Sequence, residues 1–429
     1  MSAGAYRLPA AAGAGPFAGT AALPQRLLNF TLFVTVLLNS IAFIEPSPHD
    51  ALMIVLLVAC FCARVPFDHK LAPLLVLLTI WFVGGCMALI QVGDQEKPVQ
   101  YVATSLYLDI AALTFACLFS DGDARRLWIL KRAYILSALI ATATGFIGFF
   151  HLLPGSDAFL TYDRVSATFK DPNVYGPFLI FPLVLLVIDL ATRGFRLLDV
   201  AIVATLLGGL FLSFSRGAWG HFALSASIAL VLLLAVSPDA RMRRRIITFV
   251  LIAVIAAALL TAVFMSIDSV HQMFVERAKA IQPYDVGPGG RFGHQELALS
   301  VILDHPFGIG PFEFDRMFGE QQHNVYMQGM LVYGWLGGAA YLALVALTLL
   351  VGLRTVLIPA PWQYFLVAAY ATFVGEAFEG MIVDTDHWRH FYLALGLVWG
   401  LSVATINLRR RQRFEFIFED DGLLAAAAR

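Results

Sequence analysis

Apolar residues in this chain gather into long runs that short polar breaks separate. A helix that crosses a bilayer needs about 20 mostly apolar residues, and most of these runs reach or approach that length. The pattern therefore predicts an all-α polytopic membrane protein with about twelve membrane helices. The predicted helices cover residues 27–45, 50–64, 71–91, 101–119, 128–150, 173–191, 197–214, 220–236, 246–265, 323–352, 362–382 and 389–406.

The same pattern predicts five successive parts of the chain. They are a disordered cytoplasmic tail (1–26), helices one to nine (27–265), a large periplasmic loop (266–322), helices ten to twelve (323–406) and a cytoplasmic C-terminal tail (407–429). The loop contains an amphipathic stretch, 292–304, which we expect to lie on the membrane surface as a helix. Its expected apolar face consists of Leu297, Leu299, Val301, Ile302 and Leu303.

Composition and charge agree with a membrane protein and set its direction. The chain is 59% hydrophobic and 14% charged, with a mean hydropathy of +0.76, whereas soluble domains are about a quarter charged. The net charge of -1 gives no indication of a nucleic-acid partner. With both termini in the cytoplasm, about two thirds of the Lys and Arg residues fall on the cytoplasmic side, as membrane insertion favours. The four cysteines lie in apolar runs and imply no disulfide framework.

His323 and Asn324 are the first candidates for chemistry. They stand where the long polar loop meets the tenth predicted helix. At that position they can meet a water-soluble acceptor and a lipid-borne donor at once. An unperturbed imidazole has a pKa near 6.5, so His323 can act as a general base near neutral pH.

Arg216 ends the seventh predicted helix within Ser213-Phe214-Ser215-Arg216-Gly217, close to the hydrocarbon. One interpretation is that its side chain extends to lipid phosphates at the interface. The other is that it is a fixed cation for a phosphate group, because the guanidinium pairs with two oxygens at once.

Two further outer segments carry cations. Arg164 and Lys170 precede the sixth helix and add positive charge, while Asp171 and Asn173 around Pro172 predict a turn and a helix cap. In the long loop, Arg291 opens the amphipathic stretch and can be either a surface charge or a ligand of a lipid pyrophosphate.

Carboxylates gather near the end of the eleventh helix. Glu376 and Glu379 share a helix face and are either functional or paired with an outer arginine. Asp384, Asp386 and His387 follow, but residues this close in sequence lack metal-ligand spacing, so no metal site and no cofactor are predicted.

The order of these motifs resembles that of the bacterial O-antigen ligase and O-antigen polymerase superfamily, whose members are membrane glycosyltransferases of the C type. The family's His-Asn and Gly-x-x-Gly signature is matched by His323, Asn324, Gly334 and Gly337. Its Ser-x-Ser-Arg-Gly element is matched by Ser213, Ser215, Arg216 and Gly217. Its loop elements are matched by Gly290, Arg291, His305, Pro306, Gly308 and Gly310. One position departs, because Gln295 stands where the family often has Leu.

The resemblance implies transfer of a glycan from undecaprenyl pyrophosphate to an acceptor sugar hydroxyl at the periplasmic face of the inner membrane. It implies a catalytic role for His323, Arg216 and Arg291, without a metal ion. The residues expected to bind substrate are Asn324, Ser215, Arg164 and Asp384, with Asp386 or Glu379 as alternatives to Asp384.

The acceptor separates two enzyme hypotheses. A ligase joins a finished glycan to lipid A-core in lipopolysaccharide biosynthesis, whereas a polymerase extends repeat units of O-antigen or exopolysaccharide. A transporter or lipid flippase is the alternative of another class. Transporters place their polar sites at the bilayer midplane, whereas the polar clusters here crowd one face, which favours the enzyme.

Overall fold

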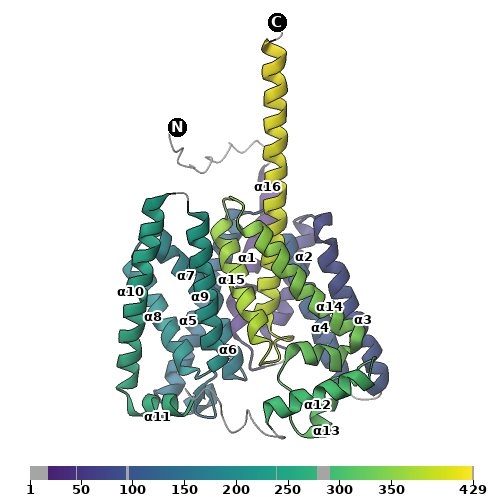
Figure 1. Ribbon diagram of the computed structural model, residues 1–429, viewed down its shortest axis with the longest axis vertical. Helices are drawn as coiled ribbons and strands as arrows, with labels where there is room; N and C mark the ends of the chain where they lie inside the picture. Colours follow the sequence, from purple (N-terminus) through teal and green to yellow (C-terminus); the bar gives the residue numbers. More distant parts are fainter. Residues whose placement is uncertain (1–17, 45, 93–95, 238, 278–289, 428–429) are drawn as a thin grey trace.

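The computed structural model describes residues 18–44, 46–92, 96–237, 239–277 and 290–427, which form a bundle of helices (Figure 1). Residues 1–17 of the predicted N-terminal tail and 278–289 of the predicted loop lie outside this part of the chain. The helices are α1 (Ala18–Leu37), α2 (Pro48–Cys62), α3 (Ala72–Val92), α4 (Glu96–Phe119), α5 (Ala124–Phe149), α6 (Pro172–Phe178), α7 (Ile180–Arg193), α8 (Leu197–Leu212), α9 (Arg216–Val236), α10 (Ala240–Met265), α11 (Asp268–Arg277), α12 (Arg291–Asp304), α13 (Glu313–Phe318), α14 (Val325–Val356), α15 (Gln363–Glu379) and α16 (Arg389–Ala427). Two short antiparallel strands, β1 (Leu160–Thr161) and β2 (Arg164–Val165), precede α6.

Every predicted span has a helical counterpart, which confirms the all-α polytopic class. By length and composition, eight helical segments of the described chain can cross a membrane, so the number of twelve stays a prediction. The eight are His69–Val92, Glu96–Phe119, Ala124–Phe149, Pro172–Arg193, Arg216–Val236, Ala240–Met265, Val325–Val356 and Arg389–Arg413. Helices α2 and α8 are apolar but shorter.

Several helix boundaries differ from the prediction. Helix α1 begins at Ala18, within the expected tail, and α16 continues to Ala427 instead of ending near 406. Good helix formers such as Arg and Glu follow residue 406, and polar side chains do not end a helix that has left the bilayer. The predicted sixth span is two helices, α6 and α7, that meet at Leu179.

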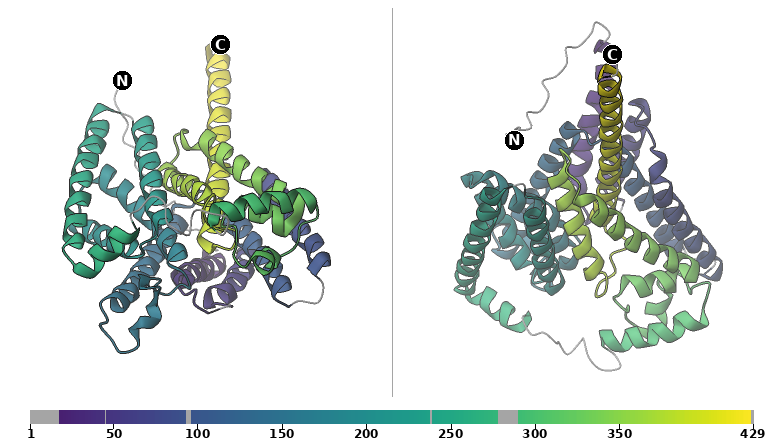
Figure 2. Two further views of the ribbon diagram at one scale, coloured as in Figure 1. Left: turned by 60° about the horizontal axis from the view of Figure 1, so that its bottom comes forward. Right: turned by 45° about the horizontal axis from the view of Figure 1, so that its top comes forward.

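The bundle has a clear centre and periphery. In the most apolar window of Pro172–Arg193, 89% of the residues are buried inside the protein, against 11% for α10, which lies at one edge (Figure 1). Helix α14 packs along α3, α16 along α4 and α15 along α9. The C-terminal part of α16 extends beyond one end of the bundle, and α11, α12 and α13 lie across the other end (Figure 2). Many large apolar side chains of α3 and α10 are exposed, as lipid-facing helices require.

Helix α12 forms where the amphipathic stretch predicts it, but its apolar residues do not share one face. Val301 and Ile302 are buried and pack against Leu331 of α14, whereas Leu299 and Leu303 point outward and are exposed. Consecutive residues turn by about 100° around a helix, so apolar residues this close in sequence cover both its sides. One side of α12 therefore docks on α14, and the other offers an apolar surface.

Gly334 interrupts α14, and the segment that follows α12 binds to the backbone at this interruption. Its φ of 67° and ψ of -176° lie in a region that only glycine adopts without strain. The segment that follows α12 fills the interruption: the N–H of Trp335 donates to the Pro306 carbonyl at 2.9 Å, and the N–H of Ile309 donates to the Leu331 carbonyl at 2.7 Å. The Gly-x-x-Gly and His-Pro-x-Gly-x-Gly motifs therefore contact each other. We call this contact between residues 306–309 and 331–335 the Gly334 joint.

We expect Gly334→Ala to destabilise this joint. The new Cβ would lie 2.7 Å from the Phe307 carbonyl carbon, and the backbone strain alone costs about 1–3 kcal/mol. Thermal unfolding in detergent should show a lower midpoint for Gly334→Ala.

Gly155→Ala is the matched control for this substitution. Gly155 also has a positive φ, of 77°, but nothing lies within 4 Å of its added Cβ. Equal losses of stability in the two variants would contradict the role of the joint.

Candidate functional site

His323 stands at the start of α14 and faces two carboxylates. Its Nδ1 lies 3.7 Å from Asp384 Oδ2, and its Nε2 lies 3.7 Å from Glu320 Oε1. Asn324 caps α14, because its side-chain oxygen accepts from the N–H groups of Tyr326 and Met327. The ring of His323 is thus held at a helix end with one edge toward the half-buried carboxyl group of Asp384.

The connection between α15 and α16 carries Asp384 to this position. The N–H of Val325 donates to the Gly380 carbonyl at 2.8 Å, and Asn324 Nδ2 donates to the Met381 carbonyl at 3.1 Å. These two bonds fasten the start of α14 to the end of α15. The Asn324 side chain, which was predicted to bind substrate, therefore caps α14 and holds its start against the end of α15.

Arg291 places a positive charge near His323 and Asp384. It is the first residue of α12, which is held on α14 by the Gly334 joint and by a bond from Trp335 Nε1 to the Ile302 carbonyl at 2.8 Å. Burial, and then the charge of Arg291, lower the pKa of His323 below 6.5. The structure thus brings together three residues that lie far apart in the predicted loop and helices.

The pKa of Asp384 shifts in the direction opposite to that of His323. Burial raises its pKa to about 7, and the nearby negative charge of Asp386 acts in the same direction. Its Oδ1 is buried and accepts no hydrogen bond from the described residues. Near neutral pH a shared proton therefore resides on Asp384 before it resides on His323, and the imidazole stays neutral.

The Arg216 segment is held by a second network. Arg164 is buried, its Nε donates to the Ser213 carbonyl at 2.9 Å and its Nη2 donates to Asn173 Oδ1 at 2.9 Å. Ser215 Oγ donates to the same oxygen at 2.9 Å and also caps α9. The geometry gives Arg164 and Ser215 structural contacts around Arg216, and their predicted role toward substrate stays a prediction.

Helix α15 connects the Arg216 segment to His323. A Cβ at Gly217 would lie 2.8 Å from Glu379 Oε1, and Glu379 directly precedes Gly380, the acceptor of the Val325 bond. Asp171, which caps α6 as the sequence predicts, contributes to the electrostatic environment of His323. The starts of α9 and α14 thus meet the end of α15, and charges at the starts of α6 and α12 act on His323.

Glu379 has a different partner from the predicted one. The prediction considered an outer arginine, but Glu379 Oε2 lies 2.7 Å from His221 Nδ1, with both side chains buried. Sequence reasoning gave His221 no context. A polar residue one turn inside an apolar helix was the available signal, because such residues are rare unless they are paired. Glu376 is buried one turn away, and its carboxyl group accepts no hydrogen bond from the described residues.

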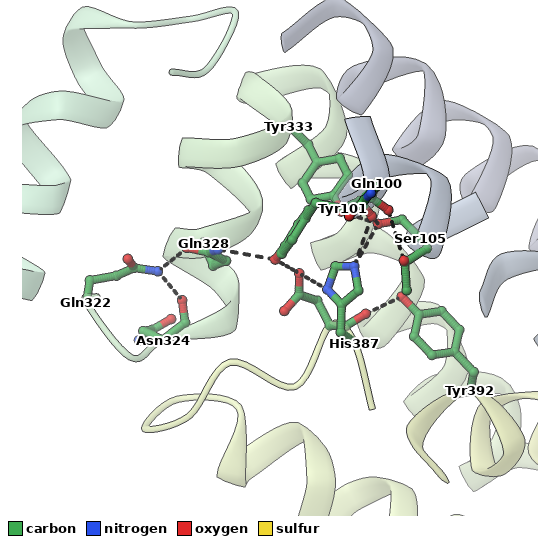
Figure 3. Close-up of polar contacts among 11 residues, drawn as sticks. Gln100, Tyr101, Ser105, Gln322, Asn324, Gln328, Tyr333, His387 and Tyr392 are labelled. Carbon is green, nitrogen blue, oxygen red and sulfur yellow. Dashed lines mark hydrogen bonds and ion pairs between the residues drawn. The ribbon is translucent and has the colours of Figure 1, made fainter. Parts of the chain in front are cut away.

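Sequence reasoning also missed Tyr101, Gln322 and Gln328, which form a buried network beside the site (Figure 3). The Tyr101 hydroxyl donates to Asp386 Oδ2 at 2.6 Å, and His387 Nδ1 lies 3.1 Å from the same oxygen. Within the residues that the structure describes, no three His, Cys, Asp or Glu side chains are placed to share a metal ion.

Comparison with known proteins agrees with the motifs. The O-antigen ligase family model matches residues 201–342, about a third of the chain. The matched segment includes Arg216, Arg291 and His323 and ends before Asp384. No curated protein matches the chain. Together with the apolar helices, the family match to residues 201–342 supports a multi-pass membrane protein of the O-antigen ligase and polymerase superfamily, as the sequence motifs predicted.

Proposed function

We propose that this protein is an O-antigen ligase-like glycosyltransferase. It moves a glycan from undecaprenyl pyrophosphate to an acceptor sugar hydroxyl, such as one on lipid A-core, at the periplasmic face of the bacterial inner membrane. The observation that carries the proposal is the 3.7 Å approach of His323 Nδ1 to the half-buried Asp384, under the positive charge of Arg291. This arrangement provides a base at the start of α14 and a cation at the start of α12 that acts on it.

In the proposed reaction the acceptor hydroxyl oxygen attacks the anomeric carbon of the donor. The carbon–oxygen bond to the pyrophosphate breaks, and the pyrophosphate leaves with that electron pair. His323 Nε2 takes the hydroxyl proton, while ionised Asp384 accepts from Nδ1–H, orients the ring and stabilises the imidazolium. General-base help of this kind is typically worth about 10²–10⁴ in rate. A single displacement inverts the configuration at the anomeric carbon.

Arg216 and Arg291 neutralise the leaving pyrophosphate. Both are the first residues of helices, so their guanidinium groups add to the positive ends of two helix dipoles. Fixed cations in a site with little water stabilise developing charge without reorganisation. In this proposal the two arginines take the part that a divalent cation plays elsewhere.

The polymerase remains a second candidate within the same family. The geometry of His323, Asp384 and the arginines serves either acceptor, and the family match includes both activities. The length of the product separates the two reactions, because a polymerase adds repeat units successively.

We expect the purified protein to transfer glycan from an undecaprenyl-pyrophosphate donor to lipid A-core or to a second lipid-linked glycan, in the presence of EDTA. His323→Ala should lower kcat by about 10²–10⁴ because it removes the base. Arg216→Ala should lower kcat by about 10²–10³ because it removes a preorganised cation. Gel or mass-spectrometric analysis of the product gives rate and chain length.

His69→Ala and Arg354→Ala are the controls, since both side chains are exposed and lie outside the site. They should keep the wild-type rate. Full activity of His323→Ala would remove the proposed base, and failure of the wild type with every acceptor would favour a transporter.

The pH dependence of kcat/KM should depend on the positive charge of Arg291. The pair is active with His323 neutral and Asp384 ionised, so kcat/KM should fall as the pH drops below about 7, where Asp384 takes up a proton. Arg291→Gln removes a cation that opposes protonation of His323, which raises the pKa and moves the acidic limb to higher pH. Arg291→Lys keeps the charge and should leave the limb in place. An unchanged limb in Arg291→Gln would contradict this electrostatic role.

A further inference from the structure

A chain of hydrogen bonds runs beside the candidate site from the His323 segment to the Asp384 segment. Gln322 Nε2 donates to Gln328 Oε1 at 2.6 Å, and Gln328 Nε2 donates to the Tyr101 hydroxyl at 3.3 Å (Figure 3). The Tyr101 hydroxyl then donates to Asp386 Oδ2 at 2.6 Å. Every donor points toward the carboxylate, so the bonds polarise one another in the same direction.

The two ends of this chain flank the two groups of the proposed proton transfer. Gln322 directly precedes His323, and its Nε2 also approaches the Asn324 carbonyl at 3.5 Å. Asp386 lies two residues after Asp384. Gln322, Gln328 and Asp386 are all buried, so these bonds are protected from exchange with water.

Asp386 is anchored on its other sides as well. His387 Nδ1 lies 3.1 Å from Asp386 Oδ2, and the Tyr392 hydroxyl donates to the Asp386 carbonyl at 2.8 Å. Burial would raise the pKa of Asp386, but the attraction of His387 and the bond from Tyr101 outweigh it and lower this pKa. Asp386 is thus a fixed negative charge near Asp384.

His387 closes the network against α4. Its Nε2 lies 3.2 Å from both the Ser105 hydroxyl and the Tyr101 carbonyl, and its ring packs on the Tyr101 ring with centroids 3.9 Å apart. Ser105 also contacts the Tyr333 hydroxyl, next to the break of α14 at Gly334. The same helix, α4, therefore contacts both the connection after α15 and α14 beside its break.

We propose that Tyr101, Gln328 and Asp386 are positioning residues that hold Asp384 against His323 for the proton transfer. The proposal rests on the proposed function for its kinetic consequence, but not for its geometry. Tyr101 touches neither group directly, and it acts through Gln328 on one side and Asp386 on the other. If the loss of one of these bonds lets either segment move by about 1 Å, the rate can fall by up to about 100-fold.

The charges around the pair define how the network acts on its protons. His323 is influenced by Arg291 of α12, by Glu320 of its own loop and by Asp171 at the start of α6. Asp384 is influenced by Asp386, by the Asn324 N–H and by Arg291. Asp386 favours the protonated form of Asp384. Removing the negative charge of Asp386 should therefore release the proton from Asp384. The resulting Asp384 carboxylate should then raise the pKa of His323.

The first experiment removes one link of the chain. Tyr101→Phe should lower kcat roughly 10- to 100-fold, with the KM of the donor changed less than threefold. The same substitution in an Asp384→Asn background should cause less than a threefold further loss, because the network acts by holding the Asp384 carboxyl group against His323. Gln328→Met breaks the chain from α14 and should behave in the same way.

Tyr134→Phe is the matched control, since Tyr134 is buried and its hydroxyl has no hydrogen-bond partner among the described residues. It should keep wild-type kcat. Equal losses from Tyr101→Phe in the wild-type and Asp384→Asn backgrounds would overturn the proposal, and so would wild-type kcat in both Tyr101→Phe and Gln328→Met.

The second experiment needs no transferase activity. Diethyl pyrocarbonate modifies neutral imidazole, so its rate at His323, followed by mass spectrometry against pH, gives the midpoint of His323 protonation. Asp386→Asn should move this midpoint to higher pH, although the substitution removes a negative charge. A midpoint that falls or stays unchanged would overturn the proposed coupling. A rise in a protein that transfers no glycan would leave the positioning network standing and reject the proposed function.

Discussion

The bond from the Val325 N–H to the Gly380 carbonyl, 2.8 Å long, joins the start of α14 to the end of α15. On one side of it the chain continues to Asn324 and His323, and on the other to Asp384. Inside or near a bilayer a backbone group without a partner is costly, so each helix end serves the other as its hydrogen-bond partner. Because both ends are fixed by the same bond, a histidine and a carboxyl group distant in sequence stay 3.7 Å apart.

The joint at Gly334 applies the same constraint to Arg291. Opening α14 at that residue leaves helical backbone groups available, and the segment after α12 supplies partners to Leu331 and Trp335. Only glycine tolerates the required backbone at Gly334, and Gly308 lies directly opposite, where a Cβ would approach Gly334 N to 2.7 Å. The glycines of the two motifs thus have a mechanical role. They set the position of α12 and, with it, the arginine that lowers the pKa of His323.

The sequence predicted the helices well because apolar run length alone determines them. It also predicted the Asp171 cap and the place of His323 at a helix start, since both depend on neighbouring residues. It could not predict that Glu379 pairs with His221, because the two lie on different helices and period and spacing carry no information on helix neighbours. Tyr101 was missed for the same reason: its partners come from α14 and from the connection after α15.

In the proposed reaction, the charges around the site give the transferred proton and the leaving pyrophosphate separate surroundings. Asp384 and Glu320 lie near His323, where the proposed reaction forms an imidazolium, and Asp386, two residues from Asp384, is held ionised by His387 and Tyr101. Arg216 stands instead at the start of α9, reached through Glu379 on the opposite side of the α15 end. Arg291 lowers the pKa of both His323 and Asp384 and so favours the neutral imidazole. A phosphate-bearing donor that engages Arg291 would partly cancel this positive charge, and the basicity of His323 would then rise only when the donor is bound.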